Sequence, residues 1–405
     1  MDLMPILSTL RRHKTAASLI VIEIALTSAI VCNALHLISN RLEVLNQDSG
    51  LPEAELVMLR VRGTGGAGDA DELSTQDMQS LRSLPGVKSA ALLNQIVYGD
   101  NSNNSGVAKT PDKNASRIVA AQYVGGEGAL ATLGLKLTEG RDFKPEEYQS
   151  GTEFDKLAVP SVGQVIINRA MAEKLFPGQS ALGQAIYVFD ESPSTVVGVV
   201  ERLTHPYPGK AENNDGYAML FPLRPNFRSG FYLLRTEPAQ RDAVLKAASA
   251  AVERIDATRI ATGGKRLTDM RAAYYAQDRS MAWLMGGVIV ALMVVTAFGI
   301  VGLASFWVQQ RTRMIGTRRA LGATRGQILR YFQLENFLLS TVGIVLGMVG
   351  AFGLSLVLMT SYELPRLPLY FLPAGALALW ALGQLAVLAP ARRAAALPPV
   401  AALRS

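Results

Sequence analysis

Side chains that could carry out catalysis or bind a metal are few and scattered in this sequence. Its 405 residues include three histidines and one cysteine, Cys32, and their wide spacing is unlike that of a metal site. A lone cysteine also rules out a disulfide within the chain. His205 lies in a proline-rich turn with no obvious serine or carboxylate partner, whereas a catalytic triad needs three groups together. We therefore expect a surface-loop histidine, no catalytic residue and no metal site.

Two glycine clusters could be mistaken for nucleotide-binding loops. They lie at residues 63–68 and 125–128, and neither follows the G-x-x-x-x-G-K-[ST] pattern whose backbone N–H groups cradle phosphates. We interpret both clusters as turns. The sequence thus predicts a chain that is not an enzyme, does not bind ATP by the usual route and carries no cofactor of its own.

The apolar residues gather into four long runs. Each run approaches or exceeds the ~20 residues that cross the hydrocarbon core as a helix, and they cover residues 16–38, 281–308, 332–359 and 371–389. The first run is too long for a signal peptide and lacks a cleavage site, so we expect it to be retained. At ~1.5 Å per residue the second run reaches ~42 Å, which predicts a projecting stalk or a tilted helix. In the third run, Gly343 and Gly347 have the spacing of a close helix contact.

Basic residues give these runs a direction. Residues 39–280 hold 27 basic and 29 acidic side chains, whereas the rest of the chain holds 13 basic and only 4 acidic ones. Six arginines lie between the second and third runs, and others precede the first and follow the fourth. Because basic loops stay in the cytoplasm, we expect segments 1–15, 309–331 and 390–405 to be cytoplasmic, and 39–280 and 360–370 to lie outside. This distribution also argues against nucleic-acid binding.

Residues 39–280 are long enough for a domain with its own core, which we expect to have two lobes. Strand and helix patterns alternate along it, as in α+β domains. One predicted helix covers residues 74–84 with Ser74 as its N-cap, and the Asn/Ser-rich residues 99–113 read as a loop. The predicted fold class is an α-helical membrane protein with four transmembrane helices and an α+β extracytoplasmic domain inserted between the first and second.

One acidic residue, Glu23, lies within the first apolar run. Intramembrane carboxylates are candidate functional groups. Glu23 is also about two turns from the basic end of the run, so a structural pairing near the membrane surface is the other possibility.

Residues 311–330, RTRMIGTRRALGATRGQILR, carry the most specific pattern in the chain. This segment resembles the cytoplasmic signature of FtsX/MacB-type ABC transporter permeases, roughly R-x-R-E-I-G-x-x-R-A-L-G-A-x-x-x-x-I. Glu335 matches a common family glutamate, and residues 390–404 resemble the family's tail. Residues 39–280 resemble its MacB-like periplasmic core domain. Met314 departs from the pattern because it stands where the family usually has glutamate, which leaves that contact in doubt.

The resemblance implies that the arginine-rich segment is a short helix along the membrane that docks on a separate ABC ATPase subunit, where ATP and Mg²⁺ bind. The residues it assigns to coupling are Arg311, Arg313, Ile315, Gly316, Arg318, Arg319, Ala320, Leu321 and Gly322. Glu23 and Glu335 are the intramembrane candidates.

The resemblance also implies a second permease copy or paralogue, possible contact with a periplasmic adaptor, membrane lipid around the spans, and a place in the bacterial inner membrane with both termini cytoplasmic. The expected function is efflux or export. Regulation of periplasmic cell-wall hydrolases, lipoprotein release, and a membrane-tethered enzyme or sensor are the alternatives.

Overall fold

The computed structural model describes residues 14–63, 69–112, 114–157, 161–189, 192–209, 215–362 and 368–396. The chain separates into two compact units, one formed by Asn46–Ala276 and the other by the segments on either side of it. Some residues that indicated sidedness or matched the family's tail lie outside the described residues, namely Arg11, Arg12, Glu363, Arg366 and residues 397–405.

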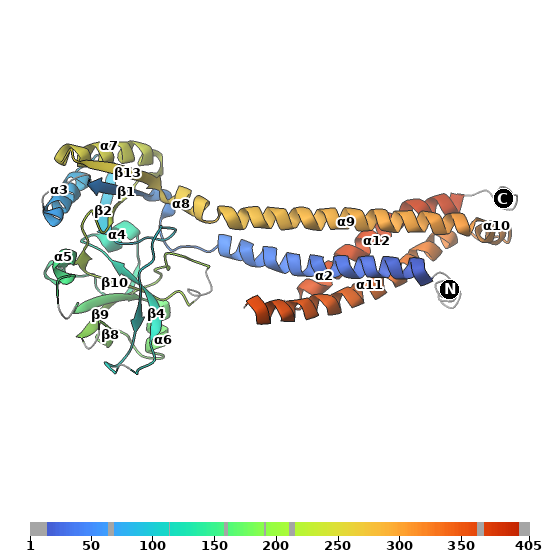
Figure 1. The fold of residues 1–405 in the computed structure, drawn as a ribbon, viewed down its shortest axis with the longest axis horizontal. Coiled ribbons are helices and arrows are strands. Elements are labelled where there is room, and N and C mark those ends of the chain that lie inside the picture. Colours follow the sequence, from blue (N-terminus) through green and yellow to red (C-terminus); the bar gives the residue numbers. More distant parts are fainter. Residues whose placement is uncertain are drawn as a thin grey trace. The chain divides into compact units, whose positions relative to one another are not determined.

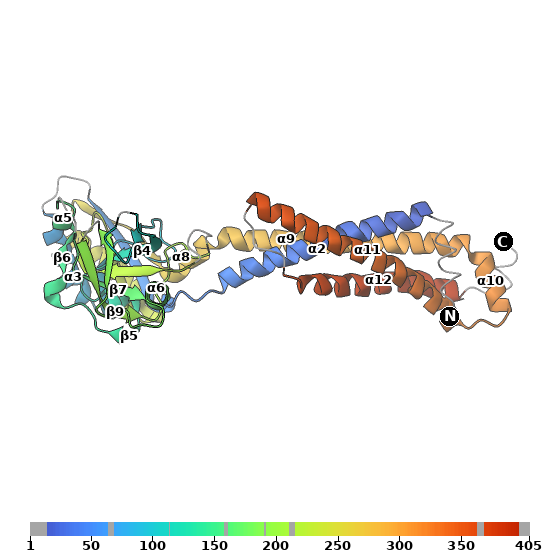
Figure 2. The ribbon, with the colours of Figure 1, turned by 90° about the horizontal axis from the view of Figure 1, so that it is seen from below.

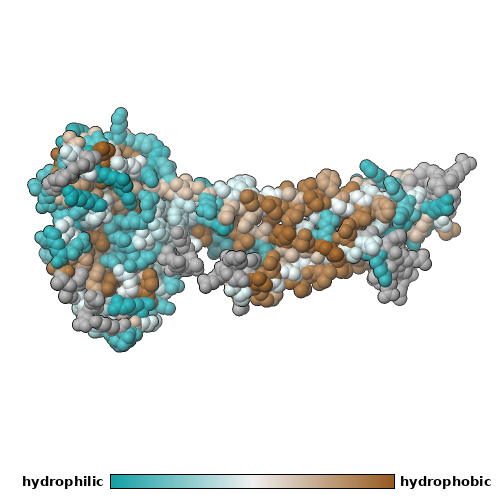
Figure 3. Space-filling model, in the orientation of Figure 1, coloured by the Kyte–Doolittle hydropathy of each residue, from teal (hydrophilic) through white to brown (hydrophobic). Residues whose placement is uncertain are grey.

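The flanking unit is a bundle of helices. Its members are α2 (Lys14–Leu45), α9 (Ala276–Gln310), α10 (Thr312–Ala320), α11 (Arg325–Tyr362) and α12 (Phe371–Ala396). All except α10 are long and apolar enough to cross a membrane. Hydrophobic side chains form a broad band over this bundle in Figure 3. The described residues therefore hold four candidate spans.

The helices run past the ends of the apolar runs. Helix α2 has 32 residues and α9 has 35, which at ~1.5 Å per residue makes them about 48 and 52 Å long, well beyond a ~30 Å hydrocarbon core. Backbone hydrogen bonding continues through the polar ends because it does not depend on side-chain hydropathy. An ion pair between Arg41 and Asp278 joins the polar ends of α2 and α9.

Small residues bring α2 and α11 close together. A Cβ added at Gly347 would lie 2.5 Å from the carbonyl oxygen of Ala25, and one at Gly343 would lie 2.9 Å from Cβ of Ile24. The predicted close contact at these two glycines is confirmed. Without side chains there, the two backbones can approach as in small-x-x-x-small packing.

The first lobe of Asn46–Ala276 is an antiparallel sheet covered by two helices (Figure 1). Its strand order is β13 (Arg259–Arg266), β1 (Leu56–Gly63), β12 (Phe231–Thr236), β2 (Val87–Leu93). Alternate residues of β1, namely Val57, Leu59 and Val61, pack against Leu81 of α3 (Ala70–Arg82) and Val244 of α7 (Arg241–Ile255). The period of two places these residues on one face of the strand, while Leu56 and Met58 on its other face are buried as well.

The second lobe is a mixed sheet that curves back on itself. Its strands are β3 (Asn104–Val107), β4 (Ile118–Val124), β10 (Ala218–Phe221), β7 (Gln164–Asn168), β9 (Ser192–Val200) and β5 (Leu137–Gly140), with β8 (Ala185–Phe189) also paired to β9. Directly after β3, the N–H of Ala108 donates to the carbonyl of Tyr187 at 3.0 Å, and the reverse bond is 2.9 Å. The apolar core includes Val165, Ile167 and Phe221.

The remaining short elements connect and cover these sheets. They are η1 (Glu53–Glu55), α4 (Ala129–Leu133), η2 (Pro145–Glu147), β6 (Gln149–Ser150), α5 (Gly151–Phe154), α6 (Arg169–Leu175), β11 (Leu223–Arg224), η4 (Pro238–Gln240) and α8 (Leu267–Tyr274). Strand β6 pairs with β11. Figure 2 shows the same elements from below.

Three local predictions were wrong. Helix α3 begins at Ala70, capped by Asp69, while Ser74 lies inside the helix and accepts a hydrogen bond from the N–H of Phe227 at 2.8 Å. Residues 99–113 contain the strand β3, because pairing with β4 overrides the turn-forming composition. His205 is only 4% exposed rather than on the surface, because its loop packs into the second lobe.

Candidate coupling site

The arginine-rich segment forms a helix and a turn at one end of the bundle. Helix α9 ends at Gln310, Arg311 occupies the N-cap position of α10 without a capping hydrogen bond from its side chain, and α11 begins at Arg325. Figure 2 shows α10 turning away from the line of α9, with the start of α11 beside it. No proline or glycine causes the change of direction at Arg311, so tertiary contacts must hold it.

A buried apolar cluster holds α10 against its neighbours. Ile315 is 2% exposed, and Gly316 beside it is also buried. The cluster joins the end of α9, α10, the start of α11 and the end of α12, through Val308, Ile315, Ile328, Phe332, Ala391, Ala394 and Ala395. Two of the predicted site residues therefore serve as anchors of the segment rather than as its exposed surface.

Arg311 and Glu335 form a buried ion pair. Nη1 of Arg311 donates to both carboxylate oxygens of Glu335, at 2.9 and 2.8 Å. The two side chains are only 7% and 2% exposed. The guanidinium carbon also lies 5.4 Å from the ring centre of Trp307, within cation–π range. The sequence placed these residues in separate groups, one for ATPase contact and one within the membrane, whereas the structure pairs them.

The turn between α10 and α11 presents an exposed tip. Leu321 is 83% exposed, and Ala320 beside it is also exposed. Gly322 has φ +97°, and a Cβ there would meet nothing within 4 Å. Gly322 thus makes a sharp bend, and no other group among the described residues approaches it closely. A side chain at position 322 would be disfavoured by the left-handed backbone, and not by a clash.

Two arginines, Arg318 and Arg319, lie in the last turn of α10 next to this tip, and a third, Arg313, lies at the start of the same helix. Arg313 is exposed, while Arg318 and Arg319 are half-buried. The guanidinium carbon of Arg318 lies 5.0 Å from the ring centre of Tyr331. Within the described residues, Nε of Arg319 is buried and has no hydrogen-bond partner. Arg318 and Arg319 therefore keep a basic surface near Leu321, although part of that surface already packs against the chain.

A reciprocal cap at the start of α11 was missed in the sequence. Oγ1 of Thr324 accepts from the N–H of Gln327 at 3.2 Å, and Oε1 of Gln327 accepts from the N–H of Thr324 at 2.9 Å. The T-x-x-Q spacing is the signal that could have revealed it. Because this cap begins two residues after Gly322, it fixes where the tip ends.

Glu23 lies away from this site, between α2 and α9. A Cβ added at Gly299 would lie 2.5 Å from a carboxylate oxygen of Glu23, so the glycine makes room for the acid. Nearby, Oγ1 of Thr27 and Oγ1 of Thr296 are 2.9 Å apart. Among the described residues Glu23 forms no ion pair, and the structure does not bring it together with the arginine-rich segment.

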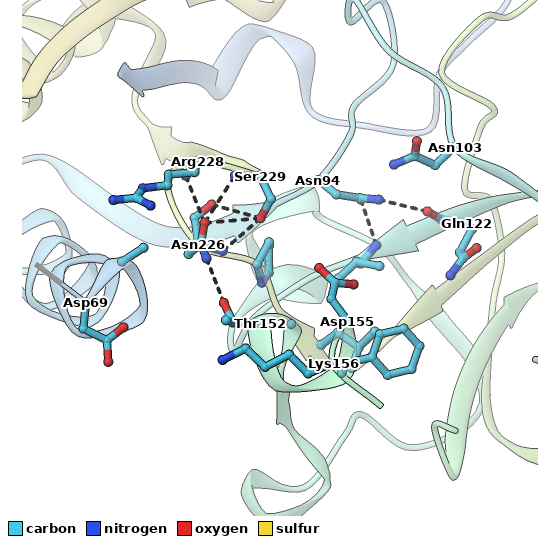
Figure 4. Close-up of a pocket in the computed structure, with 16 residues that line it drawn as sticks. Asp69, Asn94, Asn103, Gln122, Thr152, Asp155, Lys156, Asn226, Arg228 and Ser229 are labelled. Atoms are coloured by element: carbon cyan, nitrogen blue, oxygen red, sulfur yellow. Dashed lines mark hydrogen bonds between the residues drawn. The ribbon is translucent and has the colours of Figure 1, made fainter. Parts of the chain in front are cut away.

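A cleft with a volume of about 770 Å³ lies between the two lobes of Asn46–Ala276 (Figure 4). Amide and hydroxyl side chains line it, including Asn94, Gln122 and Asn226. Beside it, Asp71 accepts hydrogen bonds from Ser150, Thr152 and Asn226 at 2.5, 2.7 and 3.0 Å.

These contacts tie α3 of the first lobe to β6 and α5. Burial alone would raise the pKa of Asp71, but its three donors outweigh burial and lower that pKa. No group of metal-ligating side chains occurs among the described residues.

Two family models match the chain. The FtsX-like permease C-terminal model covers residues 286–399, and the MacB-like periplasmic core domain model covers residues 21–255, more than half of the chain. The first match includes the whole candidate site, and the second includes α2 beyond Val21 and most of the two lobes.

Similar full-length proteins carry ABC permease names. "Uncharacterized ABC transporter permease YknZ" of Bacillus subtilis is 26% identical over 283 residues, covering 69% of this chain and 68% of that protein. "Pyoverdine export ATP-binding/permease protein PvdT" of Pseudomonas syringae pv. syringae is 26% identical over 98% of this chain. "Macrolide export ATP-binding/permease protein MacB 1/2" of Paracoccus denitrificans is 28% identical over 98%. The chain spans 58% of the length of the latter two proteins.

Solved structures of single domains are also similar. The extracellular domain of YknZ shares 16% identity and a TM-score of 0.32, covering 51% of this chain and all of that one. The periplasmic region of MacB from Actinobacillus actinomycetemcomitans shares 14% identity and a TM-score of 0.34, covering 57% and 97%. On the strength of the family models, the chain belongs to the FtsX-like permeases with a MacB-like periplasmic core domain.

Proposed function

We propose that this chain is the permease of an ABC-type assembly of the MacB class, which couples ATP hydrolysis to movement of its extracytoplasmic domain in export or efflux. The observation that carries the proposal is the exposed tip at Leu321, held by the buried cluster around Ile315. An apolar side chain next to basic groups suits the centre of a protein interface. Arg313, Arg318 and Arg319 can offer donors to carboxylates on the same partner.

The names of the relatives support an ATPase as that partner. PvdT and MacB are both named as ATP-binding and permease proteins, for export of pyoverdine and of macrolides. In our proposal, ATP and Mg²⁺ bind to an ABC ATPase outside residues 1–405. A second permease copy or paralogue, a periplasmic adaptor and membrane lipid complete the assembly. It lies in the bacterial inner membrane, with both termini and the tip in the cytoplasm.

Co-purification tests this assignment. We expect tagged full-length chain, solubilised from its native membrane, to retain an ABC ATPase that mass spectrometry identifies. Leu321→Asp should weaken ATPase capture about tenfold or more, corresponding to at least ~1.4 kcal/mol of binding free energy. Leu157→Asp is the matched control, because Leu157 is an exposed leucine of the extracytoplasmic domain.

Two results would contradict the proposal: equal ATPase capture by both variants, or stoichiometric ATP binding by the purified chain alone. Capture of a cell-wall hydrolase beside the ATPase would point instead to the regulatory alternative.

A further inference from the structure

The ion pair of Arg311 with Glu335 is not part of the exposed tip. Both side chains are buried, and Leu321 follows Arg311 by almost three helical turns. A partner that docks on the tip would therefore not reach the guanidinium. Arg311 must serve a purpose inside the chain, although its position in the family signature suggested a partner contact.

The pair lies at the point where a movement of the tip would be transmitted to the membrane-spanning helices. Arg311 is the residue between α9 and α10, and Glu335 lies in α11. One guanidinium thus connects the end of one long helix, the start of the coupling helix and a third helix. Apolar contacts such as Ile315 against Phe332 hold the same elements together, but they have little directional preference. An arginine–carboxylate pair fixes orientation.

Stability alone does not explain this ion pair, because burying its charges carries a desolvation penalty. Within the described residues, Nη2 of Arg311 is buried and has no hydrogen-bond partner. A buried ion pair can often be replaced by apolar residues with no loss of stability, whereas removing one partner leaves an uncompensated charge. Its position at the junction of α9, α10 and α11 points instead to a role in fixing the geometry of these helices.

We propose that Arg311 and Glu335 are positioning residues: their ion pair locks the start of α10 to α11, so that displacement of the tip moves α9 and α11 together. This inference rests on the proposed function for the source of the displacement. The locking itself is a property of the chain alone, so the two can be tested separately.

The first test uses the chain alone in lipid nanodiscs. In a Cys32→Ala background, a spin label at Thr317→Cys reports the mobility of α10, and a label at Thr360→Cys near the end of α11 is the reference. We expect Arg311→Met with Glu335→Met to remain folded and to mobilise the label at 317 but not at 360. The charge swap Arg311→Glu with Glu335→Arg should restore much of the order.

Arg330→Met is the matched control, because Arg330 is an exposed arginine of the same segment. It should leave both labels unchanged. An ordered label at 317 in the double methionine variant would overturn the locking role.

The second test uses the complex with its ATPase. Vanadate-trapped and nucleotide-free complexes are compared by hydrogen exchange of peptides from α9 and α11. The double methionine variant should bind the ATPase within about twofold of wild type, a difference of only ~0.4 kcal/mol, yet lose the vanadate-dependent change in exchange. A wild-type response in this variant would overturn the proposal. If wild-type chain binds no ATPase, the proposed function fails, and the spin-label result still decides the locking.

Discussion

The two ring nitrogens of His205 have different partners, and these fix its protonation state. Nδ1 accepts from the N–H of Tyr207 at 3.0 Å, so it carries no proton. Nε2 lies 2.8 Å from Oδ1 of Asn104, which can only accept, so Nε2 carries the proton. Burial lowers the pKa of His205 from 6.5 to about 4. A second proton would place two N–H donors against each other at Nδ1.

We therefore predict that His205 stays neutral in the folded chain down to about pH 4. In the unfolded chain it should bind a proton below about pH 6.5. The free energy of unfolding then falls as the pH drops from about 6.5 to 4, by at most ~1.4 kcal/mol per pH unit. Histidine-labelled protein contains only three imidazole rings, and His205→Gln assigns the NMR signals of the relevant ring. A midpoint near 6.5 in folded protein would contradict the assigned hydrogen bonds.

At the scale of elements, the glycines of α11 fall into two kinds. Gly347 faces α2, where a Cβ would lie 2.5 Å from both the carbonyl oxygen of Ala25 and Cβ of Ser28. Gly353, further along the same helix, has nothing within 4 Å of that position. At Gly347 the absence of a side chain permits the contact with α2, whereas at Gly353 a side chain would meet no other helix. Because the atom nearest to a Cβ at Gly347 is a backbone oxygen of α2, it cannot move aside as the end of a side chain could.

Gly347→Val should accordingly destabilise the α2–α11 pair by about 1–3 kcal/mol or more, as overpacking does. Gly353→Val introduces the same side chain on the same helix and should have a much smaller effect. Cys32 is fully buried and is the only cysteine, so the onset of its labelling by a thiol-reactive dye during heating reports unfolding. Equal midpoints for the two variants would show that α2 and α11 do not need the glycine contact.

At the scale of the whole molecule, the chain combines an apolar bundle with a nearly neutral domain inserted after α2. Acidic and basic side chains are balanced in residues 39–280, while arginines dominate residues 311–330. That asymmetry is the basis for placing the inserted domain outside and the tip at Leu321 in the cytoplasm.

Cysteine labelling tests this topology. In a Cys32→Ala background, we expect an impermeant thiol reagent outside sealed cells to modify cysteines at Thr110 and Thr360, and to spare one at Thr324. All three positions are exposed in the structure, so burial would not protect them. Permeabilised cells provide the control, because position 324 should then react. Modification at 324 in sealed cells would overturn the arrangement of four spans.

Much of the candidate site could be read from the sequence because its signals are local. The segment around Gly322 carries a contiguous family pattern, and the glycine of that pattern has the positive φ that favours this residue type. Local sequence patterns did not show which residues of this segment are exposed and which are buried. Ile315 and Arg311 are buried, whereas Leu321 is exposed, and that division depends on contacts with α11 and α12.

The sequence by itself determined the number of candidate spans, the α+β character of the insert and the family, since apolar runs, strand periodicity and contiguous motifs are properties of neighbouring residues. Only the tertiary structure decided which distant polar groups meet. Arg259 and Asp77, 182 residues apart, form a buried pair with bonds of 2.7 and 2.9 Å. Arg311 pairs with Glu335, 24 residues away on the other side of α10. Such pairings depend on how elements pack, because a buried charge must find a partner wherever the fold places one.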